Sequence, residues 1–410
     1  MQTFLSDSIK DTPEGREADK ILRSCVHCGF CTTHCPTYRL LGDELDSPRG
    51  RIYLIKSLLE GKQASQKTRL HLDRCLTCRS CETHCPSGVE YGKLLDIGRQ
   101  VIEQQTNRSI YDKSFRKLLR TVLPYRKRFA FLLSLGKIFR PVLPGIAKKQ
   151  IPVTRKNIYP FLDQKNSRKM ILVNGCVQPS LTPLTNHAAR FILNKLGIQV
   201  IAVTGESCCG ALDYHLAAHK PAKKFIKNNI DQWWPYIEDG VEAIVSTASG
   251  CGVMIKDYGY ILRNDKDYAD KAVHVSRMTK DIVEILSGEE IDKLSATFKY
   301  KGRKVAFHNP CTLQHGQKLD TATEYLLEKA GFNLTKVQDK VLCCGSAGTY
   351  SLLQGKLSKK LLDNKIRSLE SGSPNVIVTA NVGCQLHLQQ ATSLQVKHWV
   401  ELVAESMLNN

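Results

Sequence analysis

The sequence lacks several features that would place the protein in common functional classes. It contains no run of 18 or more apolar residues, the longest candidate being Phe129 to Leu135, so we do not expect it to cross a bilayer. It has no Gly-x-Gly-x-x-Gly fingerprint and no phosphate-binding loop, so we expect no flavin or NAD on this chain. Met1 to Lys10 is polar and lacks the apolar core of a secretion signal, which predicts a reducing, cytoplasmic setting.

Acidic residues are scarce in the middle of the chain. The whole sequence has 59 Lys and Arg against 39 Asp and Glu, and residues 107–156 hold fourteen basic residues and one acid, Asp112. Apolar residues such as Phe115, Leu119 and Phe131 are interleaved with this charge. We interpret residues 107–156 as short helices that lie on an anionic surface, lipid or partner protein, and a solvated connector is the alternative. Nucleic acid is disfavoured because no recognised binding module accompanies the charge.

Cysteine, in contrast, is abundant, and all sixteen cysteines belong to repeats. Two strings of the form Cys-x2-Cys-x2-Cys-x3-Cys-Pro lie 50 residues apart: Cys25, Cys28, Cys31, Cys35 and Cys75, Cys78, Cys81, Cys85. This spacing is typical of bacterial two-cluster ferredoxins. Zinc is disfavoured because four cysteines within eleven residues exceed what one tetrahedral ion needs, and disulfides are disfavoured by the reducing setting.

The ligand sets of the two clusters are expected to cross between the strings. In two-cluster ferredoxins the fourth cysteine of each string binds the neighbouring cluster. We therefore expect one [4Fe-4S] cluster on Cys25, Cys28, Cys31 and Cys85. The other cluster is expected on Cys75, Cys78, Cys81 and Cys35. A chain with two such clusters carries electrons.

The remaining eight cysteines form two groups of four with matching spacing. The groups are Cys176, Cys208, Cys209, Cys251 and Cys311, Cys343, Cys344, Cys384. The first gap is 32 residues in both groups, and from the first cysteine of each pair to the last cysteine it is 43 and 41 residues. Spacing alone leaves three roles open for these thiols: a further cluster, a redox-active dithiol, or a bridge to a flavin-bearing partner.

The periodicity predicts an α+β multidomain chain. We expect an α-helical ferredoxin domain over residues 1–106, a basic linker over 107–166, and two tandem α/β cysteine-rich repeats over 167–300 and 301–410. Each repeat alternates strands and helices, and each cysteine follows a predicted strand, as Cys176 follows Lys169 to Val173. Because the carboxyl ends of parallel strands meet at one edge of a sheet, the four thiols of a repeat are expected to converge.

Longer segments carry a resemblance to a family. The Cys…Cys-Cys-Gly…Cys repeat resembles the cysteine-rich domain of heterodisulfide reductase, anaerobic glycerol-3-phosphate dehydrogenase and lactate-utilisation proteins. A closer resemblance, to the iron-sulfur subunits of bacterial glycolate oxidase (glycolate dehydrogenase), extends over nearly the whole chain. It rests on the segments 25–31, 41–46, 48–56, 71–78, 247–252, 311–315 and 343–350.

That resemblance implies a role in a complex. A separate FAD-binding subunit would oxidise glycolate to glyoxylate, and this chain would pass the electrons toward a quinone without acting on glycolate itself. The complex would lie peripherally on the inner face of the cell membrane. The alternative is an iron-sulfur subunit of a lactate or glycerol-3-phosphate dehydrogenase, or a heterodisulfide-reductase-like enzyme in which the Cys-Cys-Gly sites are catalytic. Heterodisulfide reductase repeats end in Cys-x-x-Cys, whereas Cys251 and Cys384 stand alone, which argues against a five-thiol cluster.

Basic residues near the strings are expected to tune the clusters. Positive charge favours the reduced, more negative state of a cluster and so makes reduction easier. The candidates are Arg23, Arg39, Arg49, Arg51, Arg74 and Arg79, for which simple surface charge is the alternative.

Overall fold

The structure, a computed structural model, describes residues 1–142, 159–160, 166–289 and 302–408. The N-terminal part is helical, as predicted. Its elements are α1 (Pro13–Ser24), α2 (Phe30–Thr33), α3 (Pro36–Leu41), the 3-10 turn Glu44–Asp46, α4 (Pro48–Leu59), α5 (Gln66–Asp73), α6 (Ser80–Thr83) and α7 (Tyr91–Gln105).

Local sequence signals explain where the longer of these helices begin. The hydroxyls of Thr12, Ser47 and Ser65 accept hydrogen bonds from the backbone N–H three residues ahead, at 2.9–3.0 Å. Pro13 and Pro48 occupy the first position of α1 and α4, where a missing N–H costs nothing. These helices pack around a core that includes Leu22, Ile55 and Leu94, and the ligand loops alternate with them.

Two further helices follow in the basic segment, α8 (Ile110–Val122) and α9 (Arg126–Phe139). Part of their positive charge is bound to the rest of the protein. Arg108 and Arg116 contact Asp73, Arg120 contacts Asp213 at 2.5 Å, and Arg126 contacts Glu206 at 3.3 Å. Residues 143–158 and 161–165 of the predicted linker lie outside the described residues. Among the helices that the structure describes, none combines the length and hydropathy needed to cross a membrane.

The first repeat is an α/β layer with a four-stranded parallel sheet. Its elements are β1 (Arg168–Leu172), α11 (Gln178–Leu181), α12 (Pro183–Lys195), β2 (Ile198–Ile201), α13 (Ala211–His215), α14 (His219–Glu238), β3 (Ala243–Ser246), α15 (Ser249–Lys256), α16 (Tyr258–Ile261), α17 (Ala269–Met278), β4 (Thr279–Asp281) and α18 (Ile282–Gly288). The strand order is β2-β1-β3-β4, and Met170 pairs with Val200 on one side and Ala243 on the other.

The second repeat has the same design. Its elements are β5 (Lys304–His308), a π-helical turn (Thr312–Gly316), α19 (Ala322–Lys329), β6 (Asn333–Leu334), α20 (Tyr350–Leu353), α21 (Gly355–Glu370), β7 (Val376–Thr379), α22 (Val382–Gln389), β8 (Val396–His398) and α23 (Trp399–Ser406). The order β6-β5-β7-β8 reproduces that of the first sheet. The predicted fold class, a helical ferredoxin part followed by two α/β repeats, is therefore confirmed.

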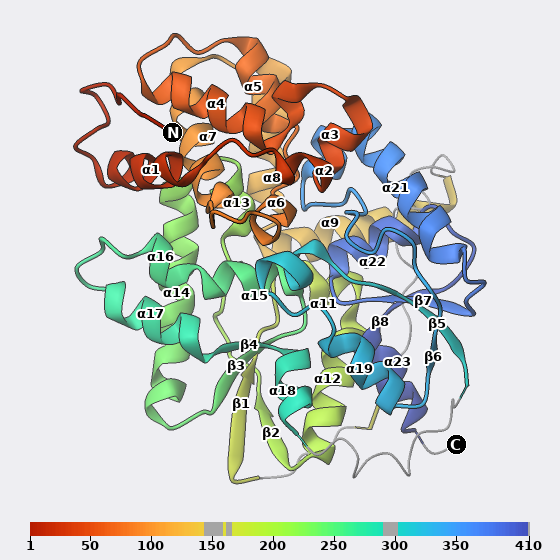
Figure 1. Cartoon of the computed structure of the whole chain (residues 1–410). Helices are drawn as coiled ribbons and strands as arrows, with labels where there is room; N and C mark the ends of the chain where they lie inside the picture. The colour runs from red at the N-terminus through yellow and green to blue at the C-terminus, as the bar shows by residue number, and fades with distance from the viewer. Residues whose placement is uncertain (143–158, 161–165, 290–301, 409–410) are drawn as a thin grey trace.

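The two repeats share one hydrophobic core. A long helix near the start of the first repeat, α12, packs on α23 at the end of the second repeat, and α18 at the end of the first repeat packs on α19 of the second. Their buried residues form a single cluster that includes Phe191, Phe307 and Trp399. Figure 1 shows the helical N-terminal part above both repeats, with α13, α15 and α22 beneath it. That arrangement brings the cysteine loops at the carboxyl ends of the strands up against the ferredoxin part.

Candidate functional site

The two ligand loops of the ferredoxin part wrap in the same way. Positive φ angles occur two and four residues after the first cysteine of each string: His27 (55°) and Gly29 (86°), then Thr77 (55°) and Arg79 (57°). Three of these four residues are not glycine, so each loop holds backbone that side chains adopt only at a cost of about 1–3 kcal/mol. These backbone angles curve the loop around a central point, as a cluster-binding loop requires.

The first set of thiols, Cys25, Cys28, Cys31 and Cys85, lines one cavity of the N-terminal part. Cys81, Arg49, Pro86 and Tyr91 lie on the same cavity wall. Cys25 is buried, Cys31 and Cys85 are half-buried, and Cys28 is exposed. Burial raises the pKa of the Cys31 thiol to about 11. Three thiols of the first string and two of the second, Cys81 and Cys85, thus line a common space.

The second set of thiols, Cys35, Cys75, Cys78 and Cys81, lies deeper in the protein. Cys35, Cys75 and Cys81 are buried, and Cys78 is half-buried. Burial raises the pKa of the Cys81 thiol well above its usual value, and the nearby charges of Cys78 and Cys75 raise it further. The same cause acts on Cys78, whose neighbours include Cys35. Here too the fourth cysteine of one string lies beside three from the other.

Hydrogen-bond donors are aimed at several of these sulfur atoms. The N–H of Thr77 and the hydroxyl of Tyr91 donate to Cys75 Sγ at 3.4 and 3.6 Å. The N–H of Val89 donates to Cys85 Sγ at 3.4 Å. Donors of this kind stabilise a thiolate bound to iron and tune the reduction potential of a cluster. Four thiols per set with N–H donors around them fit the donor set of a [4Fe-4S] cluster.

The six arginines near the strings are all paired with carboxylates. The pairs are Arg23–Asp19, Arg39–Asp339, Arg49–Glu44, Arg51–Asp46, Arg74–Asp46 and Arg79–Asp257, at 2.5–3.1 Å. Each arginine therefore acts beside an opposing charge, although Arg51 and Arg74 share the single carboxylate of Asp46. Arg51 lies next to the second set, with Nη1 4.0 Å from Cys35 Sγ.

In the first repeat the four cysteines converge as predicted. Cys176 follows β1, Cys208 and Cys209 follow β2, and Cys251 lies in the first turn of α15 after β3. The charges of Cys176 and Cys209 act on the Cys208 thiol, and those of Cys209 and Cys176 act on the Cys251 thiol, which places the four side chains close together. Gly210, at φ 90°, allows the turn that follows the vicinal pair.

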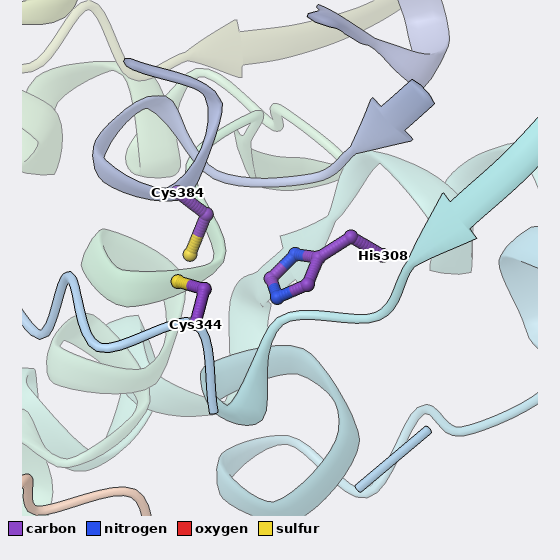
Figure 2. A group of neighbouring side chains, drawn as sticks. All are labelled: His308, Cys344 and Cys384. Atoms are coloured by element: carbon purple, nitrogen blue, oxygen red, sulfur yellow. The ribbon is translucent and has the colours of Figure 1, made fainter. Parts of the chain in front are cut away.

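The second repeat gathers its cysteines in the same order. The charge of Cys343 acts on the Cys311 thiol, that of Cys344 on Cys343, and that of Cys384 on Cys344, which places the four side chains close together. One further side chain joins them: His308, the last residue of β5, lies beside Cys344 and Cys384 (Figure 2). The sequence points to the turn at residues 308–311 as a possible contact site, but it does not by itself assign His308 a role as a metal ligand. Its position three residues before Cys311 is nevertheless a readable signal, since the first repeat has Val173 at the matching position.

The second repeat also meets the ferredoxin part at its cysteines. Cys78 and Cys311 pack against a small buried cluster that contains Cys343. The charge of Cys311 acts on Cys78, and that of Cys78 acts on Cys343. Spacing along the chain gave no sign of this junction, because Cys78 and Cys311 come from different domains.

Comparisons with known proteins agree with this layout. The family model described as "4Fe-4S dicluster domain" matches residues 21–89, and the model described as "Cysteine-rich domain" matches residues 171–256 and 305–389. A crystal structure of a hypothetical protein from Helicobacter pylori covers 99% of this chain and 74% of its own with a TM-score of 0.52 at 10% identity, which shows similarity of fold alone.

Curated relatives cover between 57% and 99% of the chain. The "Glycolate oxidase iron-sulfur subunit" of Escherichia coli (strain K12) is 50% identical over 407 residues, 99% of each chain. The "Probable glycolate oxidase iron-sulfur subunit" of Bacillus subtilis (strain 168) is 28% identical over 90% of this chain and 88% of its own. The "Lactate utilization protein A" of Bacillus licheniformis is 25% identical over 57% of this chain and 98% of its own.

Proposed function

The chain belongs to the family of glycolate oxidase iron-sulfur subunits, and on that premise we propose that it is the electron-transfer subunit of a glycolate-oxidising flavoenzyme complex. Electrons enter from a partner subunit that bears the flavin and leave toward a quinone. One observation carries this proposal: eight thiols are gathered as two sets of four within one helical domain.

We assign one [4Fe-4S] cluster to the first set and another to the second set. The common cavity supports the first assignment, and the contacts of Cys78 and Cys81 with Cys35 and Cys75 support the second. A bound cluster stores and passes on single electrons. The protein's own part is to hold the thiolates, to donate hydrogen bonds from Thr77, Val89 and Tyr91, and to keep water from the second set by burial.

The thiols of the first repeat are candidates for a further cluster. Their four cysteines converge at the carboxyl edge of one sheet, and the charges of neighbouring thiols act on one another. The lactate alternative finds less support, because the lactate utilisation relative aligns with only 57% of the chain, whereas the glycolate oxidase relative aligns with 99%.

The function is tested by separating the chain from its partner. Purified alone under anaerobic conditions, the chain is expected to show cluster absorbance and no glycolate-dependent dye reduction. Adding the flavin subunits is expected to give glycolate turnover, because the flavin then supplies the electrons. Glycolate turnover by the isolated chain would contradict the proposed division of labour, and so would a complex whose clusters stay oxidised during turnover.

We further propose that α8 and α9 rest on an anionic membrane surface. In α9 no residue is buried, and large apolar side chains stand in solvent, among them Phe131 at 64% exposure and Ile138 at 69%. Arg126, Lys127 and Arg128 open the same helix. Exposed apolar residues beside basic ones are typical of helices that lie in a lipid interface.

Charge substitutions on α9 test this surface. Replacing both Phe131 and Ile138 with Asp is expected to weaken sedimentation with phosphatidylglycerol vesicles at least tenfold, because burying one large apolar side chain contributes about 1.5–3 kcal/mol. Tyr325→Asp on α19, 54% exposed, is the control and should bind as the unaltered protein does. Equal binding of the double variant, or no preference for anionic over neutral vesicles, would contradict the membrane assignment.

A further inference from the structure

The second repeat contains a compact group of one imidazole and two thiols. The candidate ligand atoms of His308, Cys344 and Cys384 all lie within 4.8 Å of one another. All three residues are buried, at 1%, 1% and 5% exposure. They come from three elements: the end of β5, the loop after β6 and the first turn of α22. Figure 2 shows the sulfur atoms of Cys344 and Cys384 side by side, with the imidazole ring of His308 next to these two side chains.

Neighbouring groups hold each of the three in place. His308 Nδ1 lies 2.9 Å from the hydroxyl of Thr379, its register partner on β7, which leaves Nε2 as the nitrogen that can bind a metal. The amide of Asn381 donates to Cys384 Sγ at 3.5 Å. Gly345 follows the vicinal pair at φ 87°, where a Cβ would lie 2.7 Å from the carbonyl oxygen of Ser358.

The first repeat lacks this arrangement although it has the same fold. Val173 stands three residues before Cys176, where the second repeat has His308 before Cys311. Ser246 stands five residues before Cys251, where the second repeat has Thr379 before Cys384. The hydroxyl of Ser246 is turned to the carbonyl of Ala248, at 2.9 Å. The nitrogen donor therefore belongs to the second repeat alone.

The short distances between the ligand atoms within this group distinguish it from the proposed cluster sites. Within the described parts of the chain, this is the one group of three such ligands at this spacing that contains cysteine. A cubane cluster holds its thiolates on separate iron atoms and so keeps their sulfurs well apart. A single tetrahedral zinc ion, with bonds of about 2.3 Å to sulfur and about 2.0–2.1 Å to nitrogen, needs its ligands about 3.3–3.8 Å apart.

We propose that the second repeat binds one Zn²⁺ ion through His308 Nε2, Cys344 Sγ and Cys384 Sγ. Two thiolates and an imidazole are a common donor set for this ion, and the fourth position is left for water or for the adjacent Cys343. Zinc is not redox-active, so this site adds no electron carrier. It joins β5, the Cys-Cys-Gly loop and α22 to one another. These elements lie next to the place where Cys311 and Cys343 meet Cys78 of the ferredoxin part.

Metal analysis of the full-length protein tests the proposal. An anaerobic, untagged preparation treated with a mild chelator is expected to retain about one zinc per chain. His308→Val, which installs the residue of the first repeat, is expected to lower zinc at least tenfold and to leave cluster iron and sulfide unchanged. His308→Cys is expected to restore zinc, since sulfur replaces nitrogen as the ligand. His387→Gln, another buried histidine of the same repeat, bonded to Ser358, is the control and should keep zinc.

X-ray absorption at the zinc edge of the unaltered protein gives a readout that needs no variant. The expected spectrum has two sulfur neighbours and one nitrogen neighbour, with a third sulfur if Cys343 closes the site. Zinc absent from the unaltered protein would overturn the proposal. A His308→Val variant that loses iron and sulfide while keeping zinc would also overturn it, because His308, Cys344 and Cys384 would then bind a cluster. Neither result would contradict the two clusters of the proposed function.

Discussion

Removing Cys28 and Cys85 together is expected to cost the protein one cluster, whereas removing Cys28 and Cys35 together is expected to cost it both. The reason is the crossed assignment, in which Cys28 and Cys85 serve the same cluster and Cys35 serves the other. Each [4Fe-4S] cluster holds about four iron atoms, so the double alanine variants should differ by about four iron and four sulfide per chain. Both variants are expected to lose glycolate-dependent reduction of the acceptor by at least tenfold.

Iron and acid-labile sulfide, measured on anaerobic preparations, distinguish the two pairings. The single variants Cys28→Ala, Cys85→Ala and Cys35→Ala provide the baseline, and each should lose one cluster. If the Cys28 and Cys35 pair costs no more iron than either single change, the sets do not cross and each string binds its own cluster. Cys251→Ala, in the first repeat, is the control for iron outside the ferredoxin part.

The second large effect is expected at Asp46, a carboxylate that holds in place the residues around the second set of thiols. Asp46 is fully buried and lies 3.1 Å from Arg51, 2.8 Å from Arg74 and 3.1 Å from His71 Nδ1. Arg51 is itself buried, and it also donates to the carbonyl of His71 at 2.7 Å and to the hydroxyl of Thr37 at 3.0 Å. Thr37 in turn lies 3.2 Å from Cys35 Sγ.

Asp46→Asn keeps the shape of the side chain and removes its charge. The buried guanidinium of Arg51 then loses its counter-charge, and breaking a buried ion pair in this way costs about 3–5 kcal/mol. The midpoint of urea unfolding, followed by far-ultraviolet circular dichroism, should fall accordingly. Asp43→Asn is the matched control, because this exposed side chain caps the next turn through Leu45 N–H and asparagine caps equally well. If the urea midpoint shifts by the same small amount in both variants, Asp46 does not stabilise this network of ion pairs and hydrogen bonds.

The features that could be predicted from the sequence are those with a local signal. The two cysteine strings have a fixed spacing, and the apolar run Lys169 to Val173 that precedes Cys176 becomes β1 (Arg168–Leu172). Not every strand had such a signal. The β4 and β8 strands have three residues each and directly precede helices, so they are too short to show the alternating pattern of a strand in the sequence.

The arginines near the clusters show why the electrostatics could not be predicted. Two of their carboxylate partners come from distant parts of the chain: Asp257 for Arg79, 178 residues away, and Asp339 for Arg39, 300 residues away. The prediction that these charges make reduction easier remains untested, and the pairs show that each charge acts together with an opposing one. Tuning by N–H and O–H donors to sulfur, as at Cys75, is the effect that the structure supports directly.

The position of the second repeat against the ferredoxin part also could not be predicted from the sequence, and only the fold shows it. Cys78 meets Cys311 and Cys343 because the carboxyl edge of β5 faces the second ligand loop. The junction places the second set, and not the first, next to the Cys-Cys-Gly loop of the second repeat. Any electron that passes between the ferredoxin part and the second repeat would cross here.

Rapid freezing of the reconstituted complex after mixing with glycolate tests the central claim most directly. We expect the paramagnetic resonance signals of reduced [4Fe-4S] clusters to appear on this chain within a turnover, and to vanish when an oxidised quinone is added. The Cys28→Ala variant should lack one of these signals. A complex that turns over glycolate and reduces quinone while the clusters of this chain never become reduced would contradict the account.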